Sequence, residues 1–152
     1  MHPIPLENPR PKLTPYLGFD GNCTEAMRFY EAALGGKIEM TLTFGESPMA
    51  EQCPAEHRHR VMHSALSLPG GGQLFAADRP PGTDGADPTG FNGIGLTLEY
   101  GDVAVGEAAF KALADGGSIS MPMAPSFWVE RFGMLTDRYG VGWMVNAGRS
   151  KM

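Results

Sequence analysis

The sequence contains an internal repeat. Residues 19–40 (FDGNCTEAMRFYEAALGGKIEM) align without a gap with residues 100–121 (YGDVAVGEAAFKALADGGSISM). The identical pairs fall where an apolar helical pattern ends and a strand begins, and they are Phe29/Phe110, Ala33/Ala114, Gly35/Gly116, Gly36/Gly117, Ile38/Ile119 and Met40/Met121. Because a repeated unit determines the topology of the whole chain, we expect two copies of one supersecondary unit that share a core.

Each copy predicts a helix with defined ends. In the first copy Asn22 is placed to cap the helix, with Glu25 three residues further on, and in the second copy Asp102 takes the capping position. Apolar residues recur at helical spacing behind both caps. Both helices then end at a Gly-Gly pair, which supplies the positive φ angle of a C-terminal cap at little steric cost.

The end of each copy predicts a hairpin. The stretch LPGGGQLFAADR of the first copy aligns with DRYGVGWMVNAGR of the second, pairing Gly70 with Gly140 and Gly72 with Gly142. The two hairpins are closer together in sequence than the two helices, so the first copy must contain a longer insertion. The polar residues 45–60 are the natural place for it.

The pattern as a whole predicts an α+β fold in which each copy reads βαβββ. The first copy is expected to form strands and a helix over residues 12–19, 22–34 (helix), 36–44, 61–68 and 73–78. The second copy is expected to form them over residues 92–100, 103–115 (helix), 117–124, 132–137 and 142–147. The two modules, 12–79 and 92–148, make a single domain over residues 12–148.

Two segments fall outside the modules. Residues 80–91 are dense in Pro, Gly and Asp, which is typical of a linker. Residues 1–11 have proline at positions 3, 5, 9 and 11 and lack the basic-then-apolar order of a secretory signal. We expect these first residues to form a flexible N-terminal arm.

Composition excludes several classes of partner. The chain of 152 residues has a formal net charge of −5 and no basic run, which argues against nucleic-acid binding. No apolar run approaches the roughly 18 residues that a membrane span requires. Cys23 and Cys53 are expected to be free thiols in the cytoplasm. The expected partner is therefore a small molecule.

The order βαβββ, found twice, resembles the vicinal-oxygen-chelate superfamily, which includes glyoxalases, bleomycin-resistance proteins and dioxygenases. The narrower resemblance is to its PhnB-like branch, whose members are often labelled 3-demethylubiquinone-9 3-methyltransferase-like. The stretches that are similar are LTPYLGFDGNCTEAMRFYEAALGGKI, VMHSALSL, LFAADRPP and GGSISMPMAPSFWVERFGMLTDRYGVGWMVN. The resemblance implies a half-open curled mixed sheet with a ligand cleft, and a homodimer.

Enzymes of this superfamily place His or Glu ligands for a divalent metal on the first and last strands of each module. At the positions that the resemblance assigns to those ligands, this sequence has Leu13 or Thr14, the run Phe75-Ala76-Ala77, and Met144, and the opening strand of the second module offers only Asn92 and Thr97 before Glu99. None of these is an ordinary ligand for a divalent ion. We therefore expect no catalytic metal and no cofactor.

The spacing His57-x-His59-x-x-x-His63 is an alternative metal site, but the first two histidines lie in the polar insertion, where solvated side chains are the usual outcome. His63 differs because it alternates along a strand with Ala65 and Ser67, and such small residues leave room for a ligand. A hydrogen-bonded structural histidine is the other interpretation.

The candidate catalytic residues are His63 and Asp78, in acid–base roles. Asp78 ends the hairpin of the first module, so a carboxylate that caps the turn is the alternative for it. Nothing in the sequence decides whether the chain catalyses a reaction at all.

The candidate substrate-binding residues are Trp128, Arg131, Met144 and Asn146. Arg131 is placed to clamp an anionic group as a bidentate donor. Met144 and Asn146 share the strand face opposite Trp143, and we expect that face to line the cleft.

We predict from these observations a protein that binds a small molecule in its cleft without a catalytic metal. Two alternatives remain open. One is a metal-dependent enzyme of the glyoxalase or dioxygenase type, and the other is the methyltransferase that the family label suggests. The latter conflicts with the lack of a glycine-rich loop between a strand and a helix, which would hold adenosylmethionine.

Overall fold

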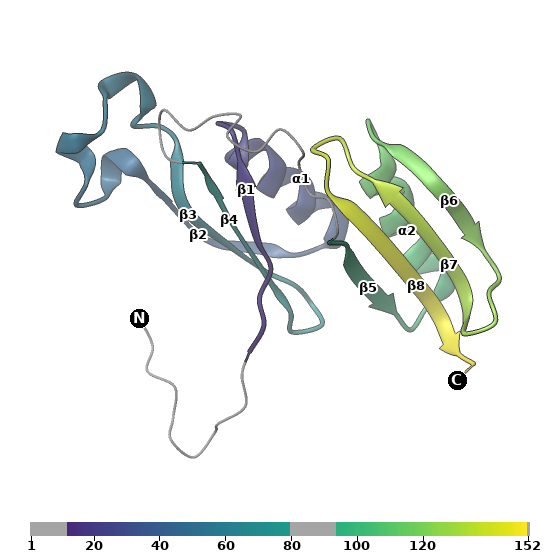
Figure 1. Ribbon diagram of the computed structural model, residues 1–152. Helices are drawn as coiled ribbons and strands as arrows, with labels where there is room; N and C mark the ends of the chain where they lie inside the picture. Colours follow the sequence, from purple (N-terminus) through teal and green to yellow (C-terminus); the bar gives the residue numbers. More distant parts are fainter. Residues whose placement is uncertain (1–11, 80–93, 152) are drawn as a thin grey trace, which may run out of the picture.

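The computed structural model describes residues 12–79 and 94–151 (Figure 1). Its first module contains β1 (Tyr16–Phe19), α1 (Cys23–Leu34), β2 (Lys37–Thr43), β3 (Val61–Ser67) and β4 (Gln73–Asp78). Its second module contains β5 (Leu96–Tyr100), α2 (Val103–Ala114), β6 (Ser118–Ala124), β7 (Val129–Thr136) and β8 (Gly142–Ser150). The predicted βαβββ order is confirmed in both copies. The predicted arm (1–11) and linker (80–91) lie outside the described residues.

Each module forms a four-stranded mixed sheet within the described residues. The strand order is β1-β4-β3-β2 in the first sheet and β5-β8-β7-β6 in the second. The first and last strands of each module pair in parallel, and the other neighbours pair antiparallel. Helix α1 packs on one face of the first sheet, α2 packs on one face of the second, and the two helices contact each other (Figure 1). The α+β prediction is therefore confirmed.

The two glycines of each Gly-Gly pair have different functions. The first glycine ends the helix in the left-handed region, with φ of 67° at Gly35 and 80° at Gly116. The second glycine allows a strand to approach closely, because a Cβ atom added at Gly36 would lie 2.6 Å from the carbonyl oxygen of Ser67. A Cβ atom at Gly117 would meet the backbone of the second sheet in the same way.

The helix starts follow the prediction in one copy only. The Asp102 carboxylate accepts a hydrogen bond from the backbone N–H of Val105 at 3.0 Å, as expected of a cap. The prediction for Asn22 is wrong, since its side chain makes no capping hydrogen bond. The carboxylate of Asp78 lies at that helix start instead.

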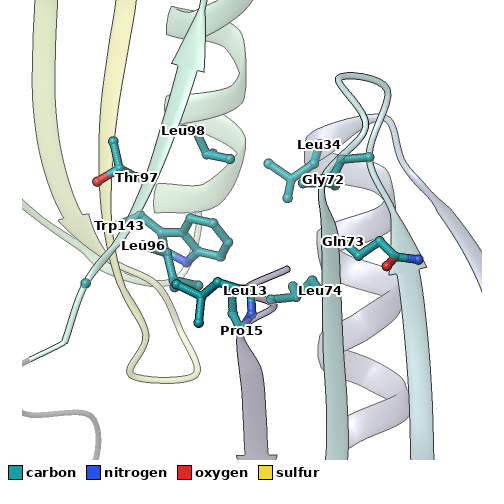
Figure 2. Close-up of a pocket in the computed structure, with 12 residues that line it drawn as sticks. Leu13, Pro15, Leu34, Gly72, Gln73, Leu74, Leu96, Thr97, Leu98 and Trp143 are labelled. Atoms are coloured by element: carbon teal, nitrogen blue, oxygen red, sulfur yellow. The ribbon is translucent and has the colours of Figure 1, made fainter. Parts of the chain in front are cut away.

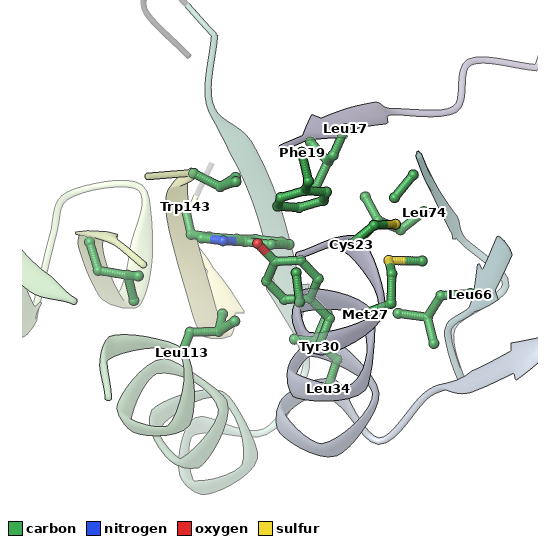
Figure 3. Close-up of a cluster of buried hydrophobic side chains, with 14 of the residues drawn as sticks. Leu17, Phe19, Cys23, Met27, Tyr30, Leu34, Leu66, Leu74, Leu113 and Trp143 are labelled. Carbon is green, nitrogen blue, oxygen red and sulfur yellow. The ribbon is translucent and has the colours of Figure 1, made fainter. Parts of the chain in front are cut away.

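A cluster of buried side chains spans both modules (Figure 3). On α1, Tyr30 lies against Trp143 of β8, whereas Met27 points towards Leu66 of the first sheet; Leu113 of α2 belongs to the same cluster. The Tyr30 and Trp143 ring centroids are 5.6 Å apart. The two repeats therefore share one core, as expected.

A buried carboxylate joins the modules at the turn between β7 and β8. Asp137 accepts hydrogen bonds from the backbone N–H groups of Tyr139 and Val141, which hold the turn. Its second oxygen accepts from the Tyr30 hydroxyl at 2.7 Å and from the Trp143 indole N–H at 2.8 Å. Helix α1 of the first module is thus hydrogen-bonded to the hairpin of the second.

The hairpin alignment proposed from sequence is off by one residue. The glycines with positive φ are Gly71 and Gly140, and each donates its N–H to the carbonyl that opens its turn, at 3.0 Å. Gly71 therefore corresponds to Gly140, whereas the sequence alignment paired Gly70 with it. Because side chains alternate along a strand, the shift assigns every hairpin residue to the other face of the sheet.

Other differences from the prediction are local. The insertion forms short 3-10 turns at Phe44–Glu46, Ala50–Gln52 and Ala55–His57. Strand β7 begins at Val129, earlier than expected, because Val129 pairs with Ser150 at the far end of β8. This long-range pairing also carries β8 past the expected module end at residue 148.

Candidate functional site

We call the side of each sheet opposite its helix the open face. Leu74, Ala76 and Asp78 of β4 are buried on the helix side. Phe75, which alternates with them, therefore points to the open face of the first sheet. The register places Tyr16 and Ala65 beside Phe75, and His63 lies on the same face of β3 as Ala65.

His63, Tyr16 and Phe75 form a contiguous group on this open face. The Tyr16 hydroxyl and His63 Nδ1 are hydrogen-bonded at 2.9 Å. The His63 and Phe75 ring centroids are 5.1 Å apart, and those of Tyr16 and His63 are 5.5 Å apart. Partial burial raises the pKa of Tyr16 above its ordinary value, so the phenol stays neutral and can donate to the imidazole. Tyr16 is thus a hydrogen-bonding partner of His63 that the sequence did not indicate.

The open face of the second sheet brings together three of the predicted residues. The indole N–H of Trp128 donates to the Asn146 side-chain oxygen at 3.0 Å. Met144 lies on the same face of β8, because the intervening Val145 is buried in the core. Phe132 pairs with Asn146 in the sheet, and its ring centroid is 4.8 Å from that of Trp128.

Two further residues of this face were not among the predicted substrate-binding residues. The parallel pairing of β5 with β8 sets Thr97 beside Met144 and Glu99 beside Asn146. Both side chains are exposed. The alternation of Leu96, Thr97, Leu98 and Glu99 is the sequence signal that identifies the outward pair.

Arg131 does not join this group. It pairs in the sheet with Ala147, whose side is covered by α2, and its guanidinium forms an ion pair with Glu107 of α2 at 3.6 Å. Arg131 therefore lies apart from the other predicted substrate-binding residues. It shares one side of β7 with the buried residues Val129, Gly133 and Leu135, and the extra residue at the irregular register after Val129 belongs to β8.

Asp78 occupies the first module's helix start. One carboxylate oxygen accepts from the backbone N–H groups of Gly21 and Cys23, at 2.8 and 3.0 Å. The other oxygen accepts from the N–H of Val61 at 2.8 Å, and the side chain is 4% exposed. These bonds match the capping alternative for Asp78, because a carboxylate enclosed by backbone donors has no free route to a ligand.

The residues of the open faces do not fit a divalent metal. Tyr16 and Phe75 line the paired strands β1 and β4, and Thr97 and Met144 line β5 and β8. Among the described residues, no group of three or more His, Cys, Asp and Glu side chains lies close enough to hold a metal ion. Ala76, which the resemblance placed near a ligand position, faces α1 and is fully buried. We derive no chemistry from a metal.

This arrangement defines a protein of two repeated βαβββ modules. The open face of each module combines apolar side chains with a hydrogen-bonded polar pair. Residues 12–145 match the Glyoxalase/Bleomycin resistance protein/Dioxygenase superfamily, and the chain belongs to this superfamily. A curated relative, Protein YjdN of Escherichia coli strain K12, is 36% identical over 142 residues, which cover 88% of this chain and 93% of YjdN.

Solved structures agree with the assignment. Protein PA1353 from Pseudomonas aeruginosa is 42% identical, with a TM-score of 0.78 over 91% of this chain and 98% of that protein. A PhnB protein from Bacillus cereus, provisionally named a 3-demethylubiquinone-9 3-methyltransferase, has a TM-score of 0.72 at 24% identity over 91% of this chain and all 100% of its own. The latter likeness concerns the fold alone.

No helix in the described ranges is both long and apolar enough to cross a membrane. Cys23 and Cys53 are free thiols, and both are buried.

Proposed function

We propose that this protein binds a small organic molecule on the open faces of its sheets, without a catalytic metal. The observation that supports this most is the hydrogen bond from Trp128 to Asn146. It fixes a polar amide among apolar side chains, which is the usual composition of a small-molecule site. The pair formed by Tyr16 and His63 is the corresponding polar feature of the first module.

The side chains indicate the kind of ligand. Trp128 and Phe132 offer aromatic surface, and Met144 and Met134, which pair across β7 and β8, offer adaptable apolar surface. Each open face also has hydrogen-bonding groups at a fixed position. The proposed ligand is therefore a largely apolar, planar molecule with one or two polar groups.

A thermal-shift screen with small aromatic and phosphonate compounds tests the proposal. A ligand present at 100 times its Kd stabilises the native state by about 2.7 kcal/mol. For a protein of this length that corresponds to a rise in Tm of roughly 5–10 °C. Asn146→Ala and His63→Ala are expected to reduce the shift produced by any compound that binds at these faces.

Arg131→Gln is the matched control, because Arg131 lies on the side of the second sheet that α2 covers. It should leave the ligand-induced shifts unchanged. If Asn146→Ala and His63→Ala also left every shift unchanged, the proposed site would be refuted.

Metal content separates this proposal from a glyoxalase-type or dioxygenase-type enzyme. Protein purified without chelator and without a metal-affinity step should contain no stoichiometric zinc, iron, manganese or nickel. One bound ion per chain would overturn the metal-free proposal. Binding of adenosylmethionine in the same thermal-shift assay would instead support the methyltransferase alternative.

We further propose a cytoplasmic homodimer. Tyr16, Met40 and Met121 are exposed by 55%, 40% and 48%, and the strand registers place them on the open faces. Apolar surface of this kind supports an interface between copies of the chain. Light scattering coupled to gel filtration should give twice the mass of the 16.3 kDa chain, and a monomeric mass would contradict the proposal.

A further inference from the structure

An apolar groove lies between the two modules, and two of its polar groups are already engaged. Its volume is about 290 Å³, and Figure 2 shows Leu74 on one side and Leu96 and Trp143 on the other. The side-chain oxygen of Gln73 in its wall accepts from the Lys12 ammonium group at 2.7 Å. The Trp143 indole N–H donates to the buried carboxylate of the turn between β7 and β8. The groove is thus mainly a surface for apolar contact.

The open face of the second sheet differs, because a hydrogen bond fixes which way its amide group is turned. The indole N–H of Trp128 can only donate, so it holds the Asn146 side-chain oxygen and leaves the amide NH2 group to donate elsewhere. Strand β8, which contains Asn146, lies between β7 and β5. Because Trp128 directly precedes β7, the amide oxygen is turned towards β7 and the NH2 group is turned away from it.

Glu99 lies on the other side of β8. The parallel pairing of β5 with β8 sets Glu99 beside Asn146, and its side chain is exposed on the open face. An ionised carboxylate only accepts hydrogen bonds, whereas an amide NH2 group only donates them. We call Asn146 and Glu99 the donor–acceptor pair. Amide and carboxylate side chains distinguish heterocycles in the same way when they bind the edges of nucleic-acid bases.

Aromatic rings lie next to the donor–acceptor pair. The Trp128 and Phe132 ring centroids are 4.8 Å apart at an interplanar angle of 67°. Phe127 packs edge-on against Trp128, also at 4.8 Å, and is 79% exposed. Met144 adds a polarisable thioether on the same face. A flat ring system that packs against this surface would present its edge to the donor–acceptor pair.

We propose that the second open face selects planar aromatic lactams. The ring C=O of the lactam accepts from the Asn146 amide NH2 group, and the adjacent ring N–H donates to the Glu99 carboxylate. This inference rests on the proposed function of the open faces, and it names the class of molecule that the second one binds. A cyclic lactam holds its C=O and N–H on one edge of a rigid ring, so both bonds form without loss of internal rotation.

Isothermal titration calorimetry of the full chain with 2-quinolone tests the proposal. The matched ligand is the N-methyl derivative of 2-quinolone, which keeps the rings and the carbonyl group but lacks the N–H donor. It should bind about tenfold more weakly than 2-quinolone, as expected when one hydrogen bond to a charged group is lost. This comparison uses the unaltered chain, so it does not depend on the folding of a variant.

Two variants assign the difference to Glu99. In Glu99→Ala the two ligands should bind with nearly equal Kd, because the carboxylate that accepts from the ring N–H is gone. Glu107→Ala is the matched control, since it removes the same charge from α2, which covers the opposite side of the sheet. The tenfold preference for 2-quinolone should persist in Glu107→Ala.

Equal affinities for the two ligands in the unaltered chain would overturn the lactam proposal, as would a preference that persists in Glu99→Ala. Absence of 2-quinolone binding at millimolar concentration would overturn it as well. The proposed function fails by a different result, namely thermal shifts that Asn146→Ala and His63→Ala leave unchanged for every compound. Other aromatic compounds whose shifts Asn146→Ala reduces would keep the open-face site and discard only the preference for lactams.

Discussion

Replacing Tyr30 by phenylalanine should weaken the link between the two modules. Tyr30 is fully buried on α1, and its hydroxyl donates to the Asp137 carboxylate of the second module at 2.7 Å. Burial is the largest cause, and the nearby Asp137 carboxylate the next, of a pKa of Tyr30 far above its ordinary value. The phenol therefore stays protonated and remains a donor throughout the accessible pH range. Phenylalanine keeps the ring and removes only this donor.

The magnitude follows from the burial of the acceptor. Asp137 is 3% exposed, and a hydrogen bond to a buried charged group contributes about 1.5–3 kcal/mol. Asp137 would retain the Trp143 indole and two backbone donors, so the carboxylate would not be left isolated. We expect Tyr30→Phe to lower the free energy of unfolding by about 2 kcal/mol. For 152 residues this corresponds to a fall in Tm of roughly 4–8 °C.

Urea unfolding followed by circular dichroism measures this loss, and Tyr139→Phe is the matched control. The Tyr139 ring centroid is 6.0 Å from that of Tyr30, but its buried hydroxyl has no hydrogen-bond partner among the described residues. Removing an unsatisfied hydroxyl should leave stability unchanged or raise it slightly. Equal losses in the two variants would refute the role of the Tyr30 hydrogen bond, as would a loss below about 0.5 kcal/mol in Tyr30→Phe.

Three other substitutions have defined outcomes. Burial, and secondly the Asp78 charge, raise the pKa of Cys23 to about 12. The neutral buried thiol therefore contributes stability below its unfolded pKa of about 8.5, and this contribution is lost as the pH rises towards 12. In urea unfolding, the free energy of unfolding should fall less between pH 8 and pH 10 in Cys23→Ala than in the parent, and equal falls would contradict the raised pKa. In Asp78→Asn, an amide NH2 group would face backbone N–H groups that now donate to the carboxylate. Calorimetry should record a free energy of unfolding lower by about 2–3 kcal/mol, and no change would contradict the capping role. Gly36→Ala places a methyl group 2.6 Å from a backbone oxygen and should cost about 2 kcal/mol in urea unfolding, whereas Gly70→Ala, which meets nothing within 4 Å, should be tolerated; equal effects would exclude the close approach as the reason for the glycine.

Much of the fold could be predicted from the sequence because its signals are local. The Gly-Gly pairs mark helix ends through the φ angle that only glycine adopts cheaply, and the apolar spacing marks the helix faces. The alternation around Trp143 likewise placed Met144 and Asn146 correctly on one face of β8. These features depend on neighbouring residues alone.

Residues whose roles depend on distant partners were assigned less well. Asp78 caps a helix that begins far earlier in the chain, so its carboxylate could equally have been read as a general base. Arg131 faces α2 because it lies on the same side of β7 as the buried residues Val129 and Leu135, and it stood outside the strand expected at 132–137. Tyr16 is hydrogen-bonded to His63 because β1 pairs in parallel with β4, and this pairing joins residues that are distant in sequence.

The repeat by itself therefore determined the number of modules, their order of elements and the superfamily to which the chain belongs. The tertiary structure decided which side chains share the open faces, where the buried Asp137 joins the modules and where a groove remains between them. The physical reason is the period of a strand: a shift of one residue in pairing moves a side chain from the core to the opposite face, and long-range hydrogen bonds set that register.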